Sequence, residues 1–321
     1  MSSTCFVTGA AGFIGSHLVD RLLASGHRVI GVDNLSLGRR AHLAQAMRTA
    51  SFEFRELDVN DYDTLLQFAG DAHSRTPIDT LWHLAANSDI QAGGARPEVD
   101  LQSTFLTTFH SLKLAHALQI PHFAFASTSA IYGVQKGLLT EDGGPWFPIS
   151  TYGAMKLASE AAITASLERH LRRAWIFRFP NVVGGRATHG ALYDFVRKLR
   201  KNPSELEVLG DGTQEKPYLH VSELIDAMIH VRTHTQDRLN YYNIAPRSTA
   251  TTVRHMAESA VRLASPGAHI RYTGGDRGWV GDVPQFAYSI QKIESTGWSP
   301  RMTSNEAVEQ ALQEIVTENP A

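Results

Sequence analysis

The sequence predicts an α/β protein built on a doubly wound parallel sheet, with a smaller α/β substrate-binding domain toward the C-terminus. Short apolar runs alternate with helical patterns through residues 1–178, as in sheets whose parallel strands are connected by helices. A glycine-rich turn separates the first apolar run from the first helical pattern. Polar or small residues follow the ends of successive strands, where ligands gather in such sheets. We therefore expect a ligand site along the carboxyl edge of the sheet.

The order of elements divides the chain into two expected domains, 1–178 and 179–321. In the first domain, strands are predicted over 5–7, 28–32, 52–57, 80–84, 122–126 and 174–178, and helices over 62–68 and 97–118 and from residues 13 and 151. In the second domain, helices are predicted over 192–199, 222–231, 252–263 and 306–316, and strands over 207–209 and 240–244. We expect segments near 215–245 to return to the first domain.

The composition is that of an ordinary soluble globular protein, with 321 residues, 43% hydrophobic and 19% charged residues and a formal net charge of -2. Such a charge indicates neither a nucleic-acid nor an anionic membrane partner, and no apolar run is long enough to cross a bilayer. The single cysteine, Cys5, excludes an internal disulfide, and no signal peptide is recognisable. We expect a cytoplasmic protein without a metal site, since His230 and His234 have no suitable partner nearby in sequence.

A glycine turn follows the first strand, with Gly9, Gly12 and Gly15 in the spacing G-x-x-G-x-x-G. Gly9 permits a sharp turn, Gly12 lets the backbone approach a phosphate, and Gly15 lets the helix pack closely on its strand. The helix N-terminus then presents N–H groups and a positive dipole end to a pyrophosphate. The alternative is a turn that binds nothing. With this turn, the first domain is a candidate dinucleotide-binding domain of the Rossmann type.

Asp33 ends the second predicted strand, about twenty residues beyond the glycines, where an acid suits the hydroxyls of an adenosine ribose. A carboxylate there repels a 2′-phosphate, which favours NAD over NADP. Arg39 and Arg40 lie nearby, and an arginine can bind that phosphate. The choice of cofactor therefore depends mainly on Asp33.

Tyr152 and Lys156 are four residues apart at the start of a predicted helix, so that both side chains share one face. A cation beside a phenol is expected to lower the phenol pKa from about 10, which makes a general base usable near neutral pH. Thr128, at the end of a neighbouring strand, can relay a proton between a sugar hydroxyl and Tyr152. The alternative is a tyrosine packed in the core and an exposed lysine.

Taken together, these motifs resemble the extended short-chain dehydrogenases/reductases and are most similar to the UDP-galactose 4-epimerase group of nucleotide-sugar enzymes. The matching segments follow the family order across nearly the whole chain: T-G-A-A-G-F-I-G-S-H-L (8–18), V-D-N-L-S (32–36), H-L-A-A (83–86), S-T-S-A-I-Y-G (127–133), Y-G-A-M-K (152–156), R-F-P-N-V-V-G (178–184), L-H-V (219–221) and G-D-V (281–283).

The resemblance implies NAD as cofactor, a UDP-sugar as substrate, and Thr128, Tyr152 and Lys156 as catalytic residues. The residues that it implies for NAD binding are Gly9, Gly12, Phe13, Ile14, Gly15, Asp33, Asn34, Ser36, Gly38, Asp58, Val59, Leu84, Ala85, Ala86, Tyr152, Lys156 and Pro180. Those that it implies for substrate binding are Thr128, Ser129, Asn181, Arg186, Leu192, Tyr193, Lys216, Tyr218, Arg277, Asp282 and Phe286. It also implies a homodimer through helices 97–118 and 151–171, which sequence alone could equally place on the sheet.

The subclass is indicated by the residues after the catalytic threonine. Among the enzymes that this chain resembles, sugar 4,6-dehydratases have Thr-Asp-Glu at this position and UDP-glucuronate decarboxylases have Thr-Ser-Glu. This chain has Thr128-Ser129-Ala130 instead. Because Ala130 cannot protonate a leaving hydroxyl, we expect epimerisation at C4 through a transient 4-keto sugar. UDP-glucose and UDP-glucuronate both stay open as substrates, with Arg186 as the discriminator, and Phe286 is expected to exclude N-acetylated sugars. The alternatives are a 4-reductase or decarboxylase of the same family, or a non-catalytic NAD-binding sensor.

Overall fold

The computed structural model describes residues 2–135, 137–247, 250–275 and 287–318, and the chain divides into two compact units. Unit 1 comprises Met1–Val134, Gly144–Arg178 and Met228–Tyr242, and unit 2 comprises Gln135–Gly143, Phe179–Ala227 and Asn243–Ala321. Residues 135–143, which lie within the first expected domain, thus belong to unit 2. The binding roles assigned to the two halves of the chain stay predictions.

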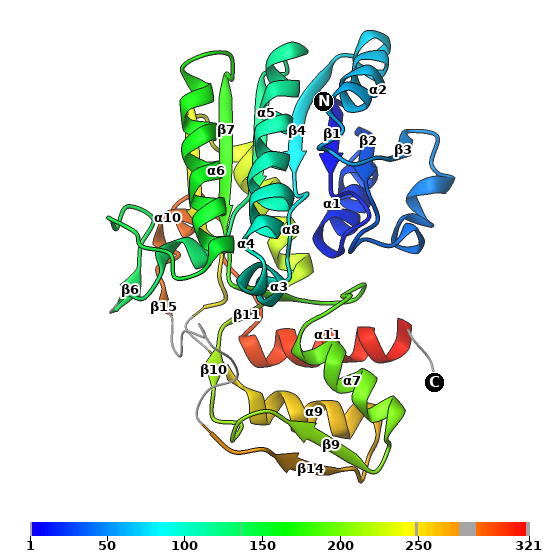
Figure 1. The fold of residues 1–321 in the computed structure, drawn as a ribbon, viewed down its shortest axis with the longest axis vertical. Coiled ribbons are helices and arrows are strands. Elements are labelled where there is room, and N and C mark those ends of the chain that lie inside the picture. The colour runs from blue at the N-terminus through cyan, green and yellow to red at the C-terminus, as the bar shows by residue number, and fades with distance from the viewer. Residues whose placement is uncertain (1, 136, 248–249, 276–286, 319–321) are drawn as a thin grey trace. The chain divides into compact units, whose positions relative to one another are not determined.

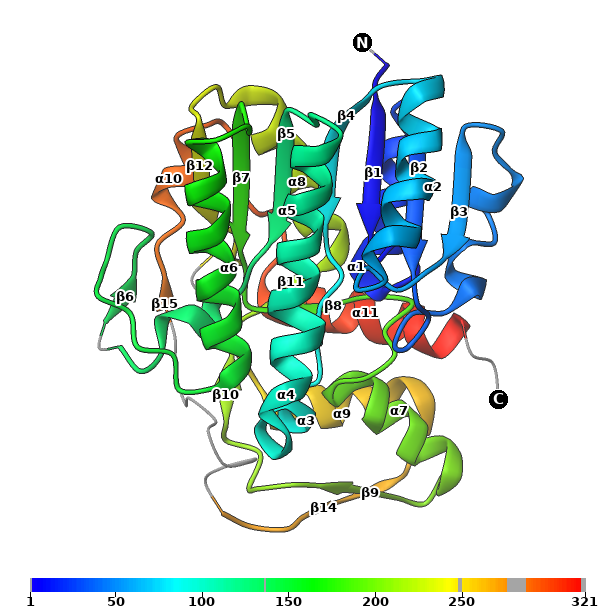
Figure 2. The ribbon, with the colours of Figure 1, turned by 45° about the horizontal axis from the view of Figure 1, so that its top comes forward.

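A seven-stranded sheet with the order β12-β7-β5-β4-β1-β2-β3 forms the centre of unit 1 (Figure 2). Its strands are β1 (Thr4–Thr8), β2 (Arg28–Asp33), β3 (Phe52–Glu56), β4 (Ile78–His83), β5 (His122–Ala126), β7 (Arg173–Arg178) and β12 (Leu239–Asn243). The pairings from β3 through to β7 are parallel. The strand order reverses between β1 and β4, which confirms the predicted doubly wound sheet and creates a switch point where ligands bind in such folds.

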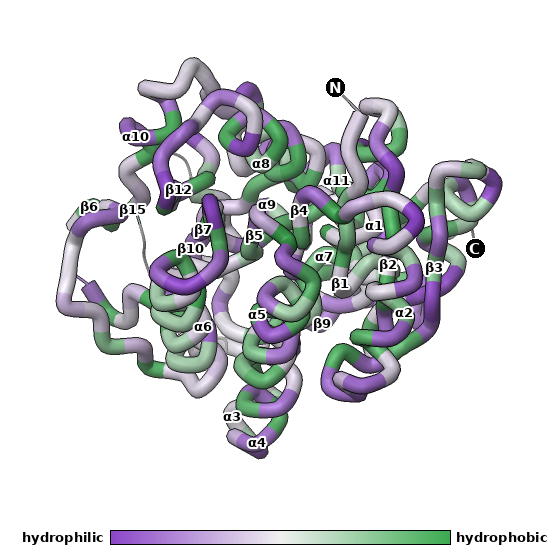
Figure 3. The backbone as a smooth tube through the Cα atoms, turned by 90° about the horizontal axis from the view of Figure 1, so that it is seen from above, coloured by the Kyte–Doolittle hydropathy of each residue, from purple (hydrophilic) through white to green (hydrophobic). Residues whose placement is uncertain are grey.

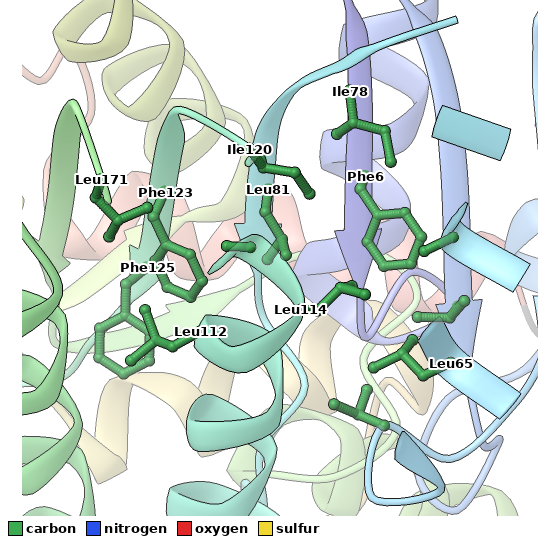
Figure 4. Close-up of a cluster of buried hydrophobic side chains, with 14 of the residues drawn as sticks. Phe6, Leu65, Ile78, Leu81, Leu112, Leu114, Ile120, Phe123, Phe125 and Leu171 are labelled. Carbon is green, nitrogen blue, oxygen red and sulfur yellow. The ribbon is translucent and has the colours of Figure 1, made fainter. Parts of the chain in front are cut away.

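Helices cover both faces of this sheet, as the view in Figure 3 shows. The helices on one face are α2 (Tyr62–Arg75), α5 (Thr107–Ala117) and α6 (Thr151–Leu167), and those on the other are α1 (Phe13–Ala24) and α8 (Val221–His234). Figure 4 shows the core under the first face, where Phe6, Leu81 and Phe123 from the strands meet leucines from the helices. Alternate residues face the other side, where Trp82 and Phe177 stack with ring centres 6.2 Å apart.

The long helix expected over 97–118 is divided. α3 (Ile90–Ala95) and α4 (Pro97–Asp100) precede η3 (Leu101–Leu106), a π-helical segment that leads into α5. The hydroxyl of Thr107 donates to the carbonyl oxygens of Ser103 and Thr104, and that of Thr108 donates to Thr104. Threonine side chains that bond back to the preceding turn compete with regular helix geometry. This local chemistry is not visible in the hydrophobic spacing that predicts a single helix.

The connections of unit 1 contain the short helical segments η1 (Arg40–Leu43), η2 (Ala46–Arg48) and η4 (Ser129–Tyr132). No helix among the described residues is long and apolar enough to cross a membrane.

Unit 2 has a hydrophobic core among α7 (Ala191–Lys201), α9 (Val253–Ala264) and α11 (Ser304–Glu318), beside the parallel pair β9 (Glu205–Val208) and β14 (His269–Tyr272) (Figure 1). Three further strand pairs are β8 (Asn181–Val183) with β11 (Tyr218–His220), β10 (Glu215–Lys216) with β13 (Thr251–Thr252), and β6 (Leu138–Leu139) with β15 (Ala287–Tyr288). The short α10 (Gln291–Glu294) completes the described elements. Most of these two- to four-residue strands were too short to predict from periodicity.

Candidate active site

The glycine turn after β1 has the close packing expected of a phosphate-binding turn. Gly9 has φ +70°, and a Cβ there would lie 2.8 Å from the backbone nitrogen of Ala85. A Cβ on Gly15 would lie 1.9 Å from the carbonyl oxygen of Gly9. Gly12 caps α1 without a side-chain hydrogen bond, and the first turn of this helix contains no acid. The backbone N–H groups of Phe13 and Ile14 therefore start a helix whose dipole suits an anion.

Asp33, the last residue of β2, is joined to this turn. Its Oδ2 accepts from the backbone nitrogen of Ala11 at 2.9 Å and its Oδ1 from that of Leu35 at 2.8 Å. A Cβ on Gly38 would lie 2.8 Å from Oδ1, so glycine is required there for the loop to approach the carboxylate. Burial raises the pKa of Asp33, and the backbone N–H groups act in the opposite direction. Asp33 thus organises the turn as well as being suited to contact a ribose.

The neighbouring loops complete the edge where the expected NAD-binding residues meet. Asn34 Nδ2 donates to Asp58 Oδ2 at 2.9 Å, which joins the ends of β2 and β3. Asn34, Ser36 and Asp58 are exposed, whereas Val59 is buried. Arg40, the alternative ligand for a 2′-phosphate, forms an ion pair with Glu56 in which Nη2 lies 2.8 Å from Oε2. Except for Pro180, which lies in unit 2, the expected NAD-binding residues all belong to unit 1.

His83, the last residue of β4, has a structural role that the sequence did not reveal. Its Nδ1 lies 2.7 Å from the hydroxyl of Thr8, which also accepts from the backbone nitrogens of Leu84 and Ala85 at 3.2 and 3.3 Å. Its Nε2 lies 3.0 Å from the hydroxyl of Thr108 on α5. Burial first, and the charge of Lys156 second, lower the pKa of His83 well below its ordinary value. A neutral imidazole therefore fixes Leu84 and Ala85 beside the glycine turn; Ala86 follows them and is half-buried.

Thr128, Tyr152 and Lys156 come together in unit 1. Thr128 caps η4 and accepts from the backbone nitrogen of Ala130 at 3.1 Å, and its side chain acts to lower the pKa of Tyr152. Ser150 caps α6 by accepting from the backbone nitrogen of Gly153 at 3.1 Å, which places Tyr152 in the first helical turn. Lys156 is 3% exposed, and its Nζ donates to the carbonyl oxygen of Ala126 at 2.7 Å.

The electrostatics of this group correct one expectation. Lys156 was expected to lower the pKa of Tyr152, but burial raises that pKa to about 12, and the hydrogen bond from Thr128 only partly opposes it. Burial also lowers the pKa of Lys156 to about 7, against the opposing charge of Glu160. The lysine is directed to Ala126, and its Nζ lies 5.9 Å from the centre of the Tyr152 ring. The desolvation of both groups therefore exceeds their mutual effect.

Asp100 is a second residue that sequence reasoning missed. It is fully buried at the end of α4, and its Oδ1 accepts from Asn87 Nδ2 at 2.8 Å. A Cβ on Gly93 would lie 1.9 Å from its Oδ2. Its negative charge contributes to the raised pKa of Tyr152. No sequence motif marked this aspartate, because its burial depends on the divided helix.

Most of the expected substrate-binding residues belong to unit 2. Asn181 is exposed at the start of β8, and Arg186 follows with φ +62° and its backbone nitrogen donating to Glu318 Oε2 at 2.6 Å. Leu192 is 3% exposed and lies in the core of unit 2, whereas Tyr193 is half-buried. Two further expected substrate-binding residues of unit 2, Lys216 in β10 and Tyr218 in β11, are half-buried. The predictions for Arg277, Asp282 and Phe286 lie outside the described residues.

The loop before Arg186 is held by carboxylates of α11. Glu314 Oε2 accepts from the backbone nitrogen of Gly185 at 2.8 Å and lies 3.2 Å from Nε2 of the buried His220. A Cβ on Gly185 would lie 2.4 Å from Glu318 Oε1. Burial acts against the Glu314 carboxylate, but these hydrogen bonds hold its pKa at about 2. The conformation of this loop is therefore fixed from within unit 2.

A doubly wound sheet with a glycine turn, a ribose-type aspartate and a Thr-Tyr-Lys group defines a dinucleotide-binding enzyme of the short-chain dehydrogenase/reductase class. Residues 5–245 match the model of the NAD dependent epimerase/dehydratase family, and the chain belongs to this family. It is an enzyme family of UDP-sugar epimerases and dehydratases whose cofactor is NAD. The family assignment made from the sequence motifs is thereby confirmed.

Individual relatives are similar over most of the chain. The UDP-glucose 4-epimerase of Mycolicibacterium smegmatis is 31% identical over 230 residues, which are 70% of this chain and 71% of that protein. A crystal structure of a UDP-galactose 4-epimerase superposes with a TM-score of 0.84 at 33% identity and covers 98% of this chain and 99% of its own. UDP-glucuronic acid decarboxylase 1 of Arabidopsis thaliana is 26% identical over 325 residues, or 96% of this chain and 69% of that protein.

Proposed function

We propose that the protein is an NAD-dependent UDP-hexose 4-epimerase. The observation that carries the proposal is the pair of Thr128 and Tyr152, whose side chains interact, with the buried Lys156 one helical turn beyond Tyr152 and Ala130 two residues after Thr128. The pair can take a proton from a hydroxyl and return it. Epimerisation at C4 is the reaction of this family that needs only those steps together with a redox cofactor.

The residues of unit 1 fit NAD. The three glycines leave room for backbone approach, α1 begins without a side-chain cap, and Asp33 is placed at the end of β2. We assign the pyrophosphate to the N-terminus of α1 and the adenosine ribose to Asp33. When bound, NAD would supply reversible oxidation at C4 of the sugar. A 2′-phosphate would meet the negative charge of Asp33, and Arg40 is already paired with Glu56.

Proton transfer is assigned to the side chains. Tyr152 accepts the proton of the sugar 4-hydroxyl as the 4-keto sugar forms, either directly or through the hydroxyl of Thr128. Lys156, when protonated, favours the phenolate that this step requires. The same proton returns from Tyr152 when the keto sugar is reduced on its other face. Since the pKa of Tyr152 is raised in the protein alone, positive charge brought by the oxidised nicotinamide would assist its ionisation.

The neighbouring reactions of the family differ from epimerisation in the groups that they need. Dehydration needs an acid to protonate the leaving hydroxyl, and the position used for it in dehydratases is Ala130 here. The similarity to a UDP-glucuronic acid decarboxylase keeps decarboxylation as the second candidate. A one-way 4-reductase would have to exchange its cofactor with solvent, and a non-catalytic sensor would not need the Thr128–Tyr152 pair.

Two sugars are proposed as substrates, UDP-glucose and UDP-glucuronate. A guanidinium at Arg186 can bind a carboxylate through two hydrogen bonds, and Ser129 can add another. Alternatively, Arg186 binds only the diphosphate, together with Lys216. Exclusion of N-acetylated sugars by Phe286 stays a prediction from sequence.

A cytoplasmic homodimer also stays a proposal. Leu101 and Phe109 are 44% and 49% exposed in η3 and α5, within the segment assigned to the dimer contact. Burying such side chains against a second copy would remove apolar surface from water.

A panel of UDP-sugars incubated without added cofactor, followed by separation of the products, tests the proposal. We expect the C4 epimer of UDP-glucose or UDP-glucuronate to accumulate to an equilibrium mixture. A UDP-pentose with released CO₂ would assign decarboxylation instead. Stoichiometric consumption of added reduced cofactor would assign a reductase, and bound NAD without any turnover would assign a sensor.

A further inference from the structure

Ser127, Glu160 and Arg178 form a second polar cluster in unit 1, beside the Thr128–Tyr152 pair. Ser127 Oγ donates to Glu160 Oε1 at 2.5 Å. Arg178 Nη2 donates to Glu160 Oε2 at 2.6 Å, and its Nε lies 3.1 and 3.2 Å from the two carboxylate oxygens. The side chains of Arg178 and Glu160 are only 4% and 6% exposed. None of the three belongs to the site expected from the sequence.

Two members of the cluster, Ser127 and Glu160, are connected to residues of the proposed proton-transfer group. Ser127 directly precedes Thr128 at the end of β5, and its backbone nitrogen donates to Phe177 O of β7 at 2.8 Å. Glu160 lies one helical turn beyond Lys156 on α6. The cluster therefore joins the strand end that carries Thr128 to the helix that carries Tyr152 and Lys156.

Arg178 is itself held in place by aromatic side chains. Its Nη1 donates to the hydroxyl of Tyr132 at 3.3 Å, and its guanidinium carbon lies 4.4 Å from the centre of the Trp146 ring. The ring of Tyr241 lies 5.5 Å away. Burial acts against the charged guanidinium, but the hydrogen bonds to Glu160 outweigh burial and raise the pKa of Arg178. The guanidinium is thus a permanent partner for Glu160.

A gain in folding stability does not explain why Glu160 and Arg178 form a buried ion pair. A buried ion pair adds little net stability compared with apolar side chains of similar volume, because both charges must be desolvated. The guanidinium fork does fix the position of both carboxylate oxygens. A fixed carboxylate in turn fixes whatever it accepts a hydrogen bond from, and here that donor is Ser127.

We propose that Glu160, held by Arg178, is a positioning residue that orients Thr128 toward Tyr152 through Ser127 and places a negative charge one helical turn from Lys156. The inference rests on the proposed function, in which Thr128 and Tyr152 move the proton.

The negative charge of Glu160 also acts on Lys156. The titratable groups around Lys156 are Glu160 and Tyr152 on α6 and His83 on β4, and on β7 Arg178 faces Glu160. Burial lowers the pKa of Lys156, and the carboxylate of Glu160 opposes this effect. Removing the negative charge of Glu160 should therefore lower the pKa of Lys156 further.

Ser127→Ala tests the positioning, because it removes one hydroxyl and leaves the ion pair intact. We expect kcat to fall about 10- to 100-fold with an unchanged KM, the effect of a small misplacement of a catalytic group. We also expect a crystal structure of the variant to show the hydroxyl of Thr128 displaced from that of Tyr152, relative to a crystal structure of the wild type. Thr235→Val is the matched control, since Thr235 is buried and accepts from Trp175 Nε1 at 3.0 Å. Its kcat should equal that of the wild type.

Glu160→Gln tests the charge. The alkaline limb of the kcat–pH profile should move to lower pH by about 1 unit or more, because a carboxylate one helical turn away favours the charged form of the lysine. A limb that stays in place would overturn the action of Glu160 on Lys156. An unchanged placement of the Thr128 hydroxyl relative to Tyr152 in Ser127→Ala, or a wild-type kcat, would overturn the positioning. If the wild type converts no UDP-sugar, the proposed function fails, whereas the crystal structure still decides the positioning.

Discussion

The ammonium of Lys156 donates to the carbonyl oxygen of Ala126 at 2.7 Å, which joins α6 to the last residue of β5. Thr128 stands two residues beyond Ala126, and Tyr152 lies one helical turn before Lys156. The lysine thus has a structural role in addition to its charge, because it fixes the helix and the strand end that carry the two hydroxyl groups.

Replacement of Tyr152 by phenylalanine should abolish turnover, by at least about a thousandfold, while NAD content stays that of the wild type. The hydroxyl is lost, but the ring still fills its site next to Thr128. The measurements are the turnover rate and the NAD released on denaturation. Tyr62→Phe, at the start of α2, is the matched control and should be fully active. A turnover near that of the wild type in Tyr152→Phe would exclude Tyr152 as the base.

Thr128→Val should slow turnover less than the loss of Tyr152 does, by about a hundred- to ten-thousandfold, since positioned proton transfer contributes that much. The methyl groups of valine preserve the shape of the side chain. Thr128→Ser should restore most of the rate because it restores the hydroxyl. If Thr128→Val has an unchanged rate, Thr128 is not part of the proton relay.

Asp33→Ala should weaken NAD binding and partly admit NADP. The change removes the negative charge near the ribose, and it also leaves the backbone nitrogens of Ala11 and Leu35 without their acceptor. Asp33→Asn removes the charge but keeps one of the two acceptor oxygens, so that comparison with Asp33→Ala shows how much of the effect is due to the charge. Dissociation constants for both cofactors provide the measurement. Equal affinities in the wild type would contradict the role given to this carboxylate.

Arg186→Leu should reduce kcat/KM for UDP-glucuronate about ten- to a hundredfold more than for UDP-glucose, because a charge-assisted pair contributes about 1.5–3 kcal/mol. Arg197→Leu, on the exposed face of α7, is the control and should affect neither sugar. Equal losses for both sugars would instead place Arg186 at the diphosphate.

Glu314 should make the stability of the protein sensitive to acid. Its pKa is lowered from 4.5 to about 2 in the folded protein, so its contribution is complete above about pH 4.5 and is lost as the pH falls from there toward 2. The side chain is 33% exposed, and we therefore expect only about 1–2 kcal/mol. Urea unfolding at pH 7 and at about pH 3.5 should show a smaller loss for Glu314→Gln than for the wild type. Identical losses would contradict this assignment.

The sequence predicted the features that depend on local pattern. The alternation of strands and helices, with a glycine turn after the first strand, was sufficient to predict a doubly wound parallel sheet. The Tyr152–Lys156 spacing placed both residues on one face of α6. The structure contains these features because each of them depends on residues that are neighbours in the sequence.

Features that depend on tertiary burial were not predictable in this way. The π-helical segment η3 depends on threonine side chains bonded back to the preceding turn. The raised pKa of Tyr152 depends on desolvation, which a pattern of residues does not reveal. Glu160 and Arg178 are ordinary charged residues that stand 18 positions apart in the sequence. Only the fold brings Arg178 Nη2 to 2.6 Å from Glu160 Oε2.

The central claim is most directly tested with UDP-glucose and UDP-glucuronate that carry deuterium at C4. In a 4-epimerase that retains its cofactor, the hydrogen removed from C4 returns to C4 of the same sugar. We predict that the C4 epimer forms with its deuterium retained, without added cofactor, as seen by mass spectrometry and NMR of the separated product. A product that has lost the deuterium to solvent, carries it at another carbon or has lost C6 as CO₂ would contradict the account.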